Sequence, residues 1–205
     1  MRINRIFCIG RNYAEHVREL GGAPDDECVV FMKPPSCVVP VGHPVALPKG
    51  RGSVHHEAEL VLLLEGGGSD ISVEHALEHV AAFTLGLDLT LRDLQNQLKK
   101  KGAPWELCKA FDGAAPLGAW TRRTDQRLDA LEFTCHVNSQ LRQSGNTKDM
   151  LFPVPRLVHI LSRTWKLEAG DVVFTGTPAG VGPLQPGDRV ALAGAGLGPF
   201  EWTCS

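Results

Sequence analysis

Two glutamates, Glu57 and Glu59, stand two residues apart in the largely apolar stretch 53–64. Successive side chains of a strand point to opposite faces, so both carboxylates project the same way, about 7 Å apart at Cα. Two ionised carboxylates in one pocket repel each other unless a proton or a cation lies between them. The pair therefore indicates a site for a hard divalent cation. The alternative is the solvent-exposed face of a half-buried strand.

A third acidic side chain, Asp88, ends another apolar run at 82–88, where a strand gives way to a loop. Arg92 and Gln95 follow on a predicted helix, three residues apart and therefore on one face. They lie near the helix N-terminus, where backbone N–H groups favour an anion. A metal ligand and an anion clamp on one strand-to-helix turn suit a carboxylate substrate, whereas ordinary helix surface is the alternative for Arg92 and Gln95.

Two further groups have the chemistry of catalysis. His16 and Glu19 are three apart on a short predicted helix, so the carboxylate can orient the imidazole as a general base. Glycines on both sides suggest that residues 10–22 form a mobile lid. The alternative for His16 and Glu19 is an incidental contact on the protein surface. Lys109 is flanked by apolar and aromatic residues, which suits an ammonium held beside a carboxylate or a developing enolate, or else a surface lysine with a buried stem.

Composition narrows the class of protein. The chain has 205 residues, 43% of them hydrophobic and 21% charged, which predicts a single domain over 1–205. A net charge of −2 with scattered basic residues disfavours nucleic acid and anionic membranes as partners. The first residues lack the apolar core of a signal peptide and no run reaches the length of a membrane span, so we expect a cytoplasmic protein. The six cysteines are spread singly and are expected to be reduced thiols.

Local patterns place these groups on elements. Helices are predicted at 14–20, at 72–80, from a Thr90–Asp93 capping box to Gly102, and at 155–163. Strands are predicted at 3–9, 29–33, 53–64, 82–88, 172–175, 189–192 and 199–202, with a hairpin turning at Asn138-Ser139. The glycine-rich stretches 175–182 and 193–198 are not phosphate loops, because neither contains a GK[ST] motif and the second leads into a strand.

Taken together and in order, these motifs resemble the fumarylacetoacetate hydrolase family. The set comprises Ile9 to Tyr13, His16 with Glu19, Phe31 to Pro35, His55 to Glu59, Leu87 to Gln95, Lys99 to Trp105, Lys109 to Phe111, Asn138 to Gln143, and Thr175 to Gly182. The match covers nearly the whole chain and is specific to the short acylpyruvase and oxaloacetate decarboxylase branch. Two positions depart from the pattern, Ala58 and Ser139, and neither bears on the chemistry.

The resemblance implies an α+β, mainly β fold, with a mixed β-roll or barrel, short peripheral helices, and a homodimer. It implies Mg²⁺ or Mn²⁺ held by Glu57, Glu59 and Asp88. Catalytic roles fall on His16, Glu19 and Lys109, and substrate contacts on Arg11, Arg92, Gln95 and Thr177.

The predicted function is hydrolysis of a C–C bond in a small acylpyruvate, a 2,4-diketo acid, which gives pyruvate and a carboxylic acid. Two alternatives remain open at this point. The same site suits an oxaloacetate decarboxylase or tautomerase, or an isomerase of a related keto acid, because each needs the same enolate to be stabilised. A non-catalytic dimeric metal-binding protein is the alternative from another class.

Overall fold

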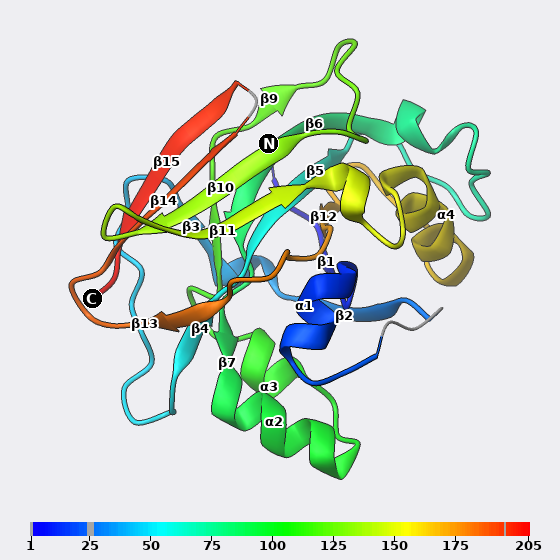
Figure 1. Ribbon diagram of the computed structural model, residues 1–205. Coiled ribbons are helices and arrows are strands. Elements are labelled where there is room, and N and C mark those ends of the chain that lie inside the picture. The colour runs from blue at the N-terminus through cyan, green and yellow to red at the C-terminus, as the bar shows by residue number, and fades with distance from the viewer. Residues whose placement is uncertain (1, 24–26, 195) are drawn as a thin grey trace.

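A computed structural model describes residues 2–23, 27–194 and 196–205 (Figure 1). The α-helices are α1 (Ala14–Glu19), α2 (Arg92–Lys101), α3 (Glu106–Lys109) and α4 (Val154–Thr164), and the 3-10 turns are η1 (Pro35–Cys37), η2 (Ala76–His79) and η3 (Thr147–Asp149). The strands are β1 (Ile6–Gly10), β2 (Val29–Lys33), β3 (Val38–Pro40), β4 (Val54–His56), β5 (Ala58–Leu64), β6 (Val80–Leu87), β7 (Thr90–Leu91), β8 (Ala115–Leu117), β9 (Thr121–Arg122), β10 (Glu132–Val137), β11 (Gln140–Asn146), β12 (Val172–Phe174), β13 (Gly182–Leu184), β14 (Arg189–Gly194) and β15 (Leu197–Thr203).

The strands form three sheets. An eight-stranded sheet has the order β2-β1-β12-β5-β6-β8-β3, with β9 also paired to β6. A four-stranded sheet, β11-β10-β14-β15, lies across it, and a small sheet, β13-β4-β7, lies below (Figure 1). Helices α2 and α3 lie together at the lower end of the view, α1 lies beside β2, and α4 lies at the side of the molecule (Figure 1). This mainly β arrangement confirms the predicted fold class.

Strand β5 is the centre of the main sheet. It lies between β12 and β6, and all of its residues are buried because both faces of the sheet are covered. Leu60 and Leu62 are fully buried there together with Phe174 of β12, and burying side chains of this kind stabilises the fold by about 1.5–3 kcal/mol each. The strand that carries Glu59 is therefore among the most firmly held parts of the chain.

The prediction of one strand over 53–64 is wrong in an informative way. The chain leaves the small sheet after His56 and enters the main sheet at Ala58, so Glu57 lies at the crossing between β4 and β5. Pairing with two different sheets requires this break. Alternation alone could not reveal it, because the residues on both sides of Glu57 have extended backbones.

The other predictions of local structure had mixed outcomes. The hairpin at Asn138-Ser139 is confirmed, and both residues have the positive φ that such a turn needs. Helix α2 ends at Gly102 as predicted, but its capping box is wrong: Thr90 donates to the Asp88 carbonyl, and Asp93 accepts from the backbone N–H of Ser53.

The segment 72–80 contains only the 3-10 turn η2, not a longer helix. The glycine-rich stretch 193–198 includes position 195, which lies outside the described residues. Among the described residues, no helix combines the length and the apolar character needed to cross a membrane.

Candidate metal and substrate site

Three carboxylates that are distant in sequence meet at one point of the fold. Glu59 lies on β5, Glu57 at the crossing before it, and Asp88 directly after β6. The antiparallel pairing of β5 with β6 ends with a hydrogen bond of 2.8 Å from the Asp88 N–H to the Glu57 carbonyl, which brings the two residues side by side. One oxygen of each carboxylate lies within 4.8 Å of the others, and all three residues are buried.

Buried cations partly neutralise this cluster. Lys109 Nζ lies 2.8 Å from Glu57 and 2.5 Å from Asp88, and Lys33 Nζ lies 2.8 Å from the other oxygen of Asp88. Arg92 donates to Glu57 through a guanidinium N–H. Burial by itself raises the pKa of the Glu57 carboxyl, but Lys109 and Arg92 outweigh burial and hold that pKa below its usual range.

Glu59 differs from its two neighbours. Its carboxylate accepts a 2.7 Å hydrogen bond from the Gly176 N–H, yet it forms no ion pair with a basic side chain of the described residues. Burial, followed by repulsion from Asp88 and Glu57, raises its pKa well above the usual value. Three buried carboxylates, one without a counter-charge, provide the oxygen ligands that Mg²⁺ and Mn²⁺ prefer, so the donor set fits such an ion.

The predicted general base, His16, and its partner Glu19 lie on α1 at the edge of the same site. His16 is buried, and its Nδ1 lies 3.0 Å from Glu19 Oε2. The other oxygen of Glu19 accepts a 2.9 Å hydrogen bond from the Gly180 N–H, which holds α1 against the loop after β12. Because Nδ1 faces a carboxylate, Nδ1 carries the proton and Nε2 is the basic nitrogen.

A residue that sequence reasoning missed, Gln143 of β11, orients Thr177. The Gln143 Oε1 atom accepts from the Ala58 N–H at 3.0 Å and lies 2.9 Å from His56 Nδ1, while Nε2 donates to Thr177 Oγ1 at 2.8 Å and to the Pro178 carbonyl at 2.9 Å. The Ala58 N–H can only donate and the Pro178 carbonyl can only accept, so these two partners fix the orientation of the Gln143 side-chain amide. Thr177 then donates to the Ala58 carbonyl at 2.9 Å and presents an acceptor to a ligand.

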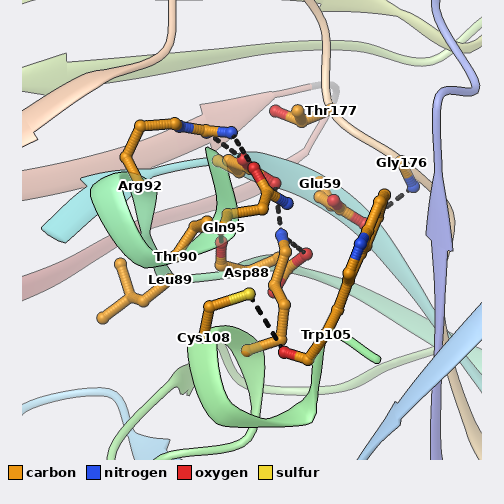
Figure 2. Close-up of polar contacts among 12 residues, drawn as sticks. Glu59, Asp88, Leu89, Thr90, Arg92, Gln95, Trp105, Cys108, Gly176 and Thr177 are labelled. Atoms are coloured by element: carbon orange, nitrogen blue, oxygen red, sulfur yellow. Dashed lines mark hydrogen bonds and ion pairs between the residues drawn. The ribbon is translucent and has the colours of Figure 1, made fainter. Parts of the chain in front are cut away.

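These groups surround one cavity of about 310 Å³, which lies at the small end of the range for ligand sites. Every predicted site residue except Glu19 lines it, as do Phe31, Lys99 and Trp105. Arg92 donates to Gln95 Oε1 at 2.5 Å, which leaves the Gln95 amide N–H groups for a ligand. In Figure 2, Glu59, Asp88, Arg92 and Gln95 converge on one space, with Trp105 at its edge.

Lys33 is the second residue that sequence reasoning missed. It is 2% exposed, and besides Asp88 it contacts the carbonyls of Leu89, at 3.3 Å, and Lys109. The signal was present: Lys33 ends an apolar strand just as Lys109 interrupts an apolar segment. The 2% exposure of Lys109 excludes the surface alternative for that residue.

Comparison with known proteins agrees with this geometry. The family model for the C-terminal domain of fumarylacetoacetate hydrolase matches residues 5–204. The oxaloacetate tautomerase YcgM of Escherichia coli is 41% identical over 192 residues, which cover 93% of this chain and 88% of the relative.

Two solved structures share the whole fold. The fumarylpyruvate hydrolase of Pseudomonas aeruginosa, in complex with Mn²⁺ and pyruvate, is 39% identical, covers 98% of this chain and 89% of its own, and superimposes with a TM-score of 0.95. The 5-carboxymethyl-2-hydroxymuconate delta-isomerase of Mycobacterium smegmatis is 35% identical, covers 98% of this chain and 78% of its own, and has a TM-score of 0.87.

The protein combines a mainly β fold with three carboxylates that converge in one pocket, and its relatives of known function are enzymes. The chain belongs to the fumarylacetoacetate hydrolase family.

Proposed function

We propose that this protein is a divalent-metal-dependent hydrolase that cleaves the C–C bond of acylpyruvates to give pyruvate and a carboxylic acid. The observation that carries the proposal is the position of His16, which is paired with Glu19 and lines the same cavity as Glu57, Glu59 and Asp88. The fumarylpyruvate hydrolase of Pseudomonas aeruginosa, a relative of known structure, supports it.

Glu57, Glu59 and Asp88 would hold the ion, Mg²⁺ or Mn²⁺. When bound, such an ion supplies Lewis acidity that polarises the ketone of a 2-keto acid. Arg92 and the free N–H groups of Gln95 bind the carboxylate end of the substrate. Lys109 offsets the negative charge that develops on the pyruvate enolate.

His16 acts as the general base through Nε2. It removes a proton from water, whose oxygen forms a bond to the acyl carbonyl carbon, and the C–C bond breaks with its electron pair passing to C3 of pyruvate. The same imidazolium returns the proton to C3. Glu19, 3.0 Å from Nδ1, stabilises the imidazolium that exists between these steps.

A second candidate is tautomerisation or decarboxylation of oxaloacetate, and one observation favours it. The proton of the Thr177 hydroxyl is committed to the Ala58 carbonyl, so Thr177 offers an acceptor that suits an enol O–H. The relative from Escherichia coli is an oxaloacetate tautomerase. In this reaction His16 would exchange a proton with C3 instead of activating water.

The test is a parallel assay of the purified protein, loaded with Mg²⁺ or Mn²⁺, on acetylpyruvate, fumarylpyruvate and oxaloacetate. Pyruvate, CO₂ and enol absorbance are measured. Pyruvate without CO₂ from the first two substrates supports the hydrolase; enol–keto exchange or CO₂ release from oxaloacetate alone supports the second candidate. Metal uptake without turnover of any substrate supports the non-catalytic alternative.

A matched pair of variants tests the base. His16→Ala is expected to lower hydrolysis by about 10²–10⁴-fold without loss of metal binding. His75→Ala is the control, because His75 forms the same kind of i,i+3 contact with Glu78, at 2.9 Å, on the exposed surface. If His16→Ala and His75→Ala hydrolyse the substrate at the same rate, His16 is not the general base.

We further propose a single domain, a lid formed by residues 10–22, and a homodimer. Sedimentation equilibrium tests the dimer, and amide hydrogen exchange with and without pyruvate tests the lid. The cytoplasmic location stays a prediction.

A further inference from the structure

Asn12 is a fully buried polar side chain that the proposed chemistry does not use. It lies just before α1, outside the lining of the cavity. Its Oδ1 atom accepts from the Phe152 N–H at 2.7 Å, and its Nδ2 atom donates to the carbonyls of Phe152, at 3.1 Å, and Thr175, at 2.7 Å. Arg11, directly before it, has a φ of +64°, a conformation that persists in a non-glycine residue only where the surrounding contacts enforce it. Asn12 therefore fixes the start of the segment that carries His16.

The hydrogen bond from Asn12 to Thr175 reaches a proposed metal ligand through a single peptide group. The Thr175 carbonyl and the Gly176 N–H belong to the same planar peptide and point in opposite directions. Asn12 donates to that carbonyl at 2.7 Å, and that N–H donates to Glu59 Oε2 at 2.7 Å (Figure 2). Hydrogen bonds in such a chain polarise one another, so the contact with Asn12 strengthens the contact with Glu59.

This peptide cannot drift away from either partner. The backbone N–H and the hydroxyl of Thr175 both donate to the Leu60 carbonyl, at 3.1 and 2.9 Å. On the other side, a Cβ at Gly176 would lie 2.6 Å from the Cβ of Asn12, so the loop packs directly on that residue. Glu59 has no ion pair with a basic side chain in the described part of the chain, so its orientation depends on the Gly176 N–H.

The same loop also holds the far end of α1. Glu19 Oε1 accepts from the Gly180 N–H at 2.9 Å, while Asn12 holds the near end through Thr175. The helix that carries the proposed base and the carboxylate of a proposed metal ligand are thus attached to one loop, residues 175–180.

We infer that Asn12 is a positioning residue for both halves of the site: it orients Glu59 for the metal ion, and it couples binding of the ion to the docking of α1. The inference rests on the metal site of the proposed function. Coupling between two sites is reciprocal, so docked α1 tightens metal binding by the same factor by which the bound ion disfavours the opening of α1.

The first test is isothermal titration calorimetry with Mn²⁺. Asn12→Ala is expected to weaken Mn²⁺ binding by about 10–100-fold, the usual effect of removing a group that orients a metal ligand. Ser162→Ala is the matched control, because Ser162 is also buried and joins distant segments: it accepts from the Ile71 N–H at 2.9 Å and donates to the His159 carbonyl at 2.8 Å. This control should lower the Tm without changing the affinity for Mn²⁺.

The second test is amide hydrogen exchange, followed by mass spectrometry, with and without saturating Mg²⁺. In the wild type, the ion should slow exchange in α1 at least about fivefold, including the Val17 N–H, which donates to the Tyr13 carbonyl at 3.0 Å. In Asn12→Ala this response should disappear. Local exchange in α4, which lies away from the cavity, is the internal reference and should not respond to Mg²⁺.

Two results overturn the inference: an unchanged affinity for Mn²⁺ in Asn12→Ala, or exchange in wild-type α1 that does not respond to Mg²⁺. The wild-type exchange decides the matter if Asn12→Ala does not fold. Acetylpyruvate turnover separates the two proposals. Turnover together with either contrary result refutes the role of Asn12 alone, whereas the expected binding and exchange without turnover refute the hydrolase alone. Absence of Mn²⁺ uptake by the wild type refutes the metal site on which both rest.

Discussion

Replacing Glu59 by glutamine should make the protein more stable than the wild type without metal and less stable than the wild type with metal bound. The substitution keeps the size of the side chain and an oxygen that accepts from the Gly176 N–H, but it removes the one carboxylate of the cluster that lacks a basic partner among the described residues. The pKa of Glu59 is raised, so in the wild type this group costs stability as the pH rises from its unfolded value of 4.5 towards its folded value. The variant loses this penalty.

The magnitude follows from the geometry. Two unit charges 4.8 Å apart, the upper limit within the cluster, repel by about 3.5 kcal/mol at an effective dielectric constant of about 20. Lys109 and Lys33 offset part of this repulsion, and proton uptake limits the remainder. We therefore expect Glu59→Gln to raise the free energy of unfolding in EDTA by about 1–3 kcal/mol at pH 8, and by less at pH 6. For a chain of this length, each kcal/mol corresponds to about 2–4 °C in Tm.

Metal should reverse the order. A ligand at 1,000 times its Kd stabilises the folded state by about 4.1 kcal/mol, which exceeds the advantage of the variant in EDTA, and we expect this gain for the wild type but not for Glu59→Gln. Differential scanning calorimetry of both proteins at pH 6 and pH 8, in EDTA and in Mg²⁺ or Mn²⁺, measures the effects of the substitution, of pH and of metal on Tm. Glu65→Gln is the control, because Glu65 is 64% exposed and 3.8 Å from Arg122. A variant less stable than the wild type in EDTA, with an undiminished response to metal, would refute the reasoning.

Three further predictions concern groups around the site. Lys33→Met leaves one oxygen of Asp88 without its 2.8 Å partner and should cost about 3–5 kcal/mol in urea unfolding; a loss below about 1 kcal/mol contradicts the role of this ion pair. Gln143→Leu removes four buried hydrogen bonds and should cost about 2–5 kcal/mol, with kcat falling more than the affinity for metal; an unchanged Tm argues against the network. Burial, opposed by Arg156, raises the pKa of Cys28 to about 11. Alkylation of this thiol should therefore accelerate about tenfold per pH unit from pH 8 to pH 10, which peptide mass spectrometry measures. A rate that is flat over this range contradicts the raised pKa.

Most of the side chains that line the cavity could be proposed from the sequence because the signals were local. Two glutamates with strand spacing, an acid at the end of an apolar run, and a histidine three residues from a glutamate each predict their chemistry from neighbouring residues. The end of α2 at Gly102 was equally predictable, since glycine adopts the left-handed φ of +60° that the cap requires.

Other features depended on contacts between distant segments. Asp93 does not cap α2, because its carboxylate binds the N–H of Ser53, a residue forty positions earlier. Gln143 lies on a hairpin of a different sheet and reaches Thr177 only because that sheet folds over β5. No period or motif in the sequence carries this information.

The sequence by itself therefore predicted the candidate site residues, and it determined the mainly β class of the fold. Tertiary structure alone decided that Glu57 marks a crossing between two sheets and that Lys33 and Lys109 partly neutralise the acidic cluster. The physical reason is that propensity and alternation act over a few residues, whereas charge balance in a buried site is set by every group that the fold brings within a few ångströms.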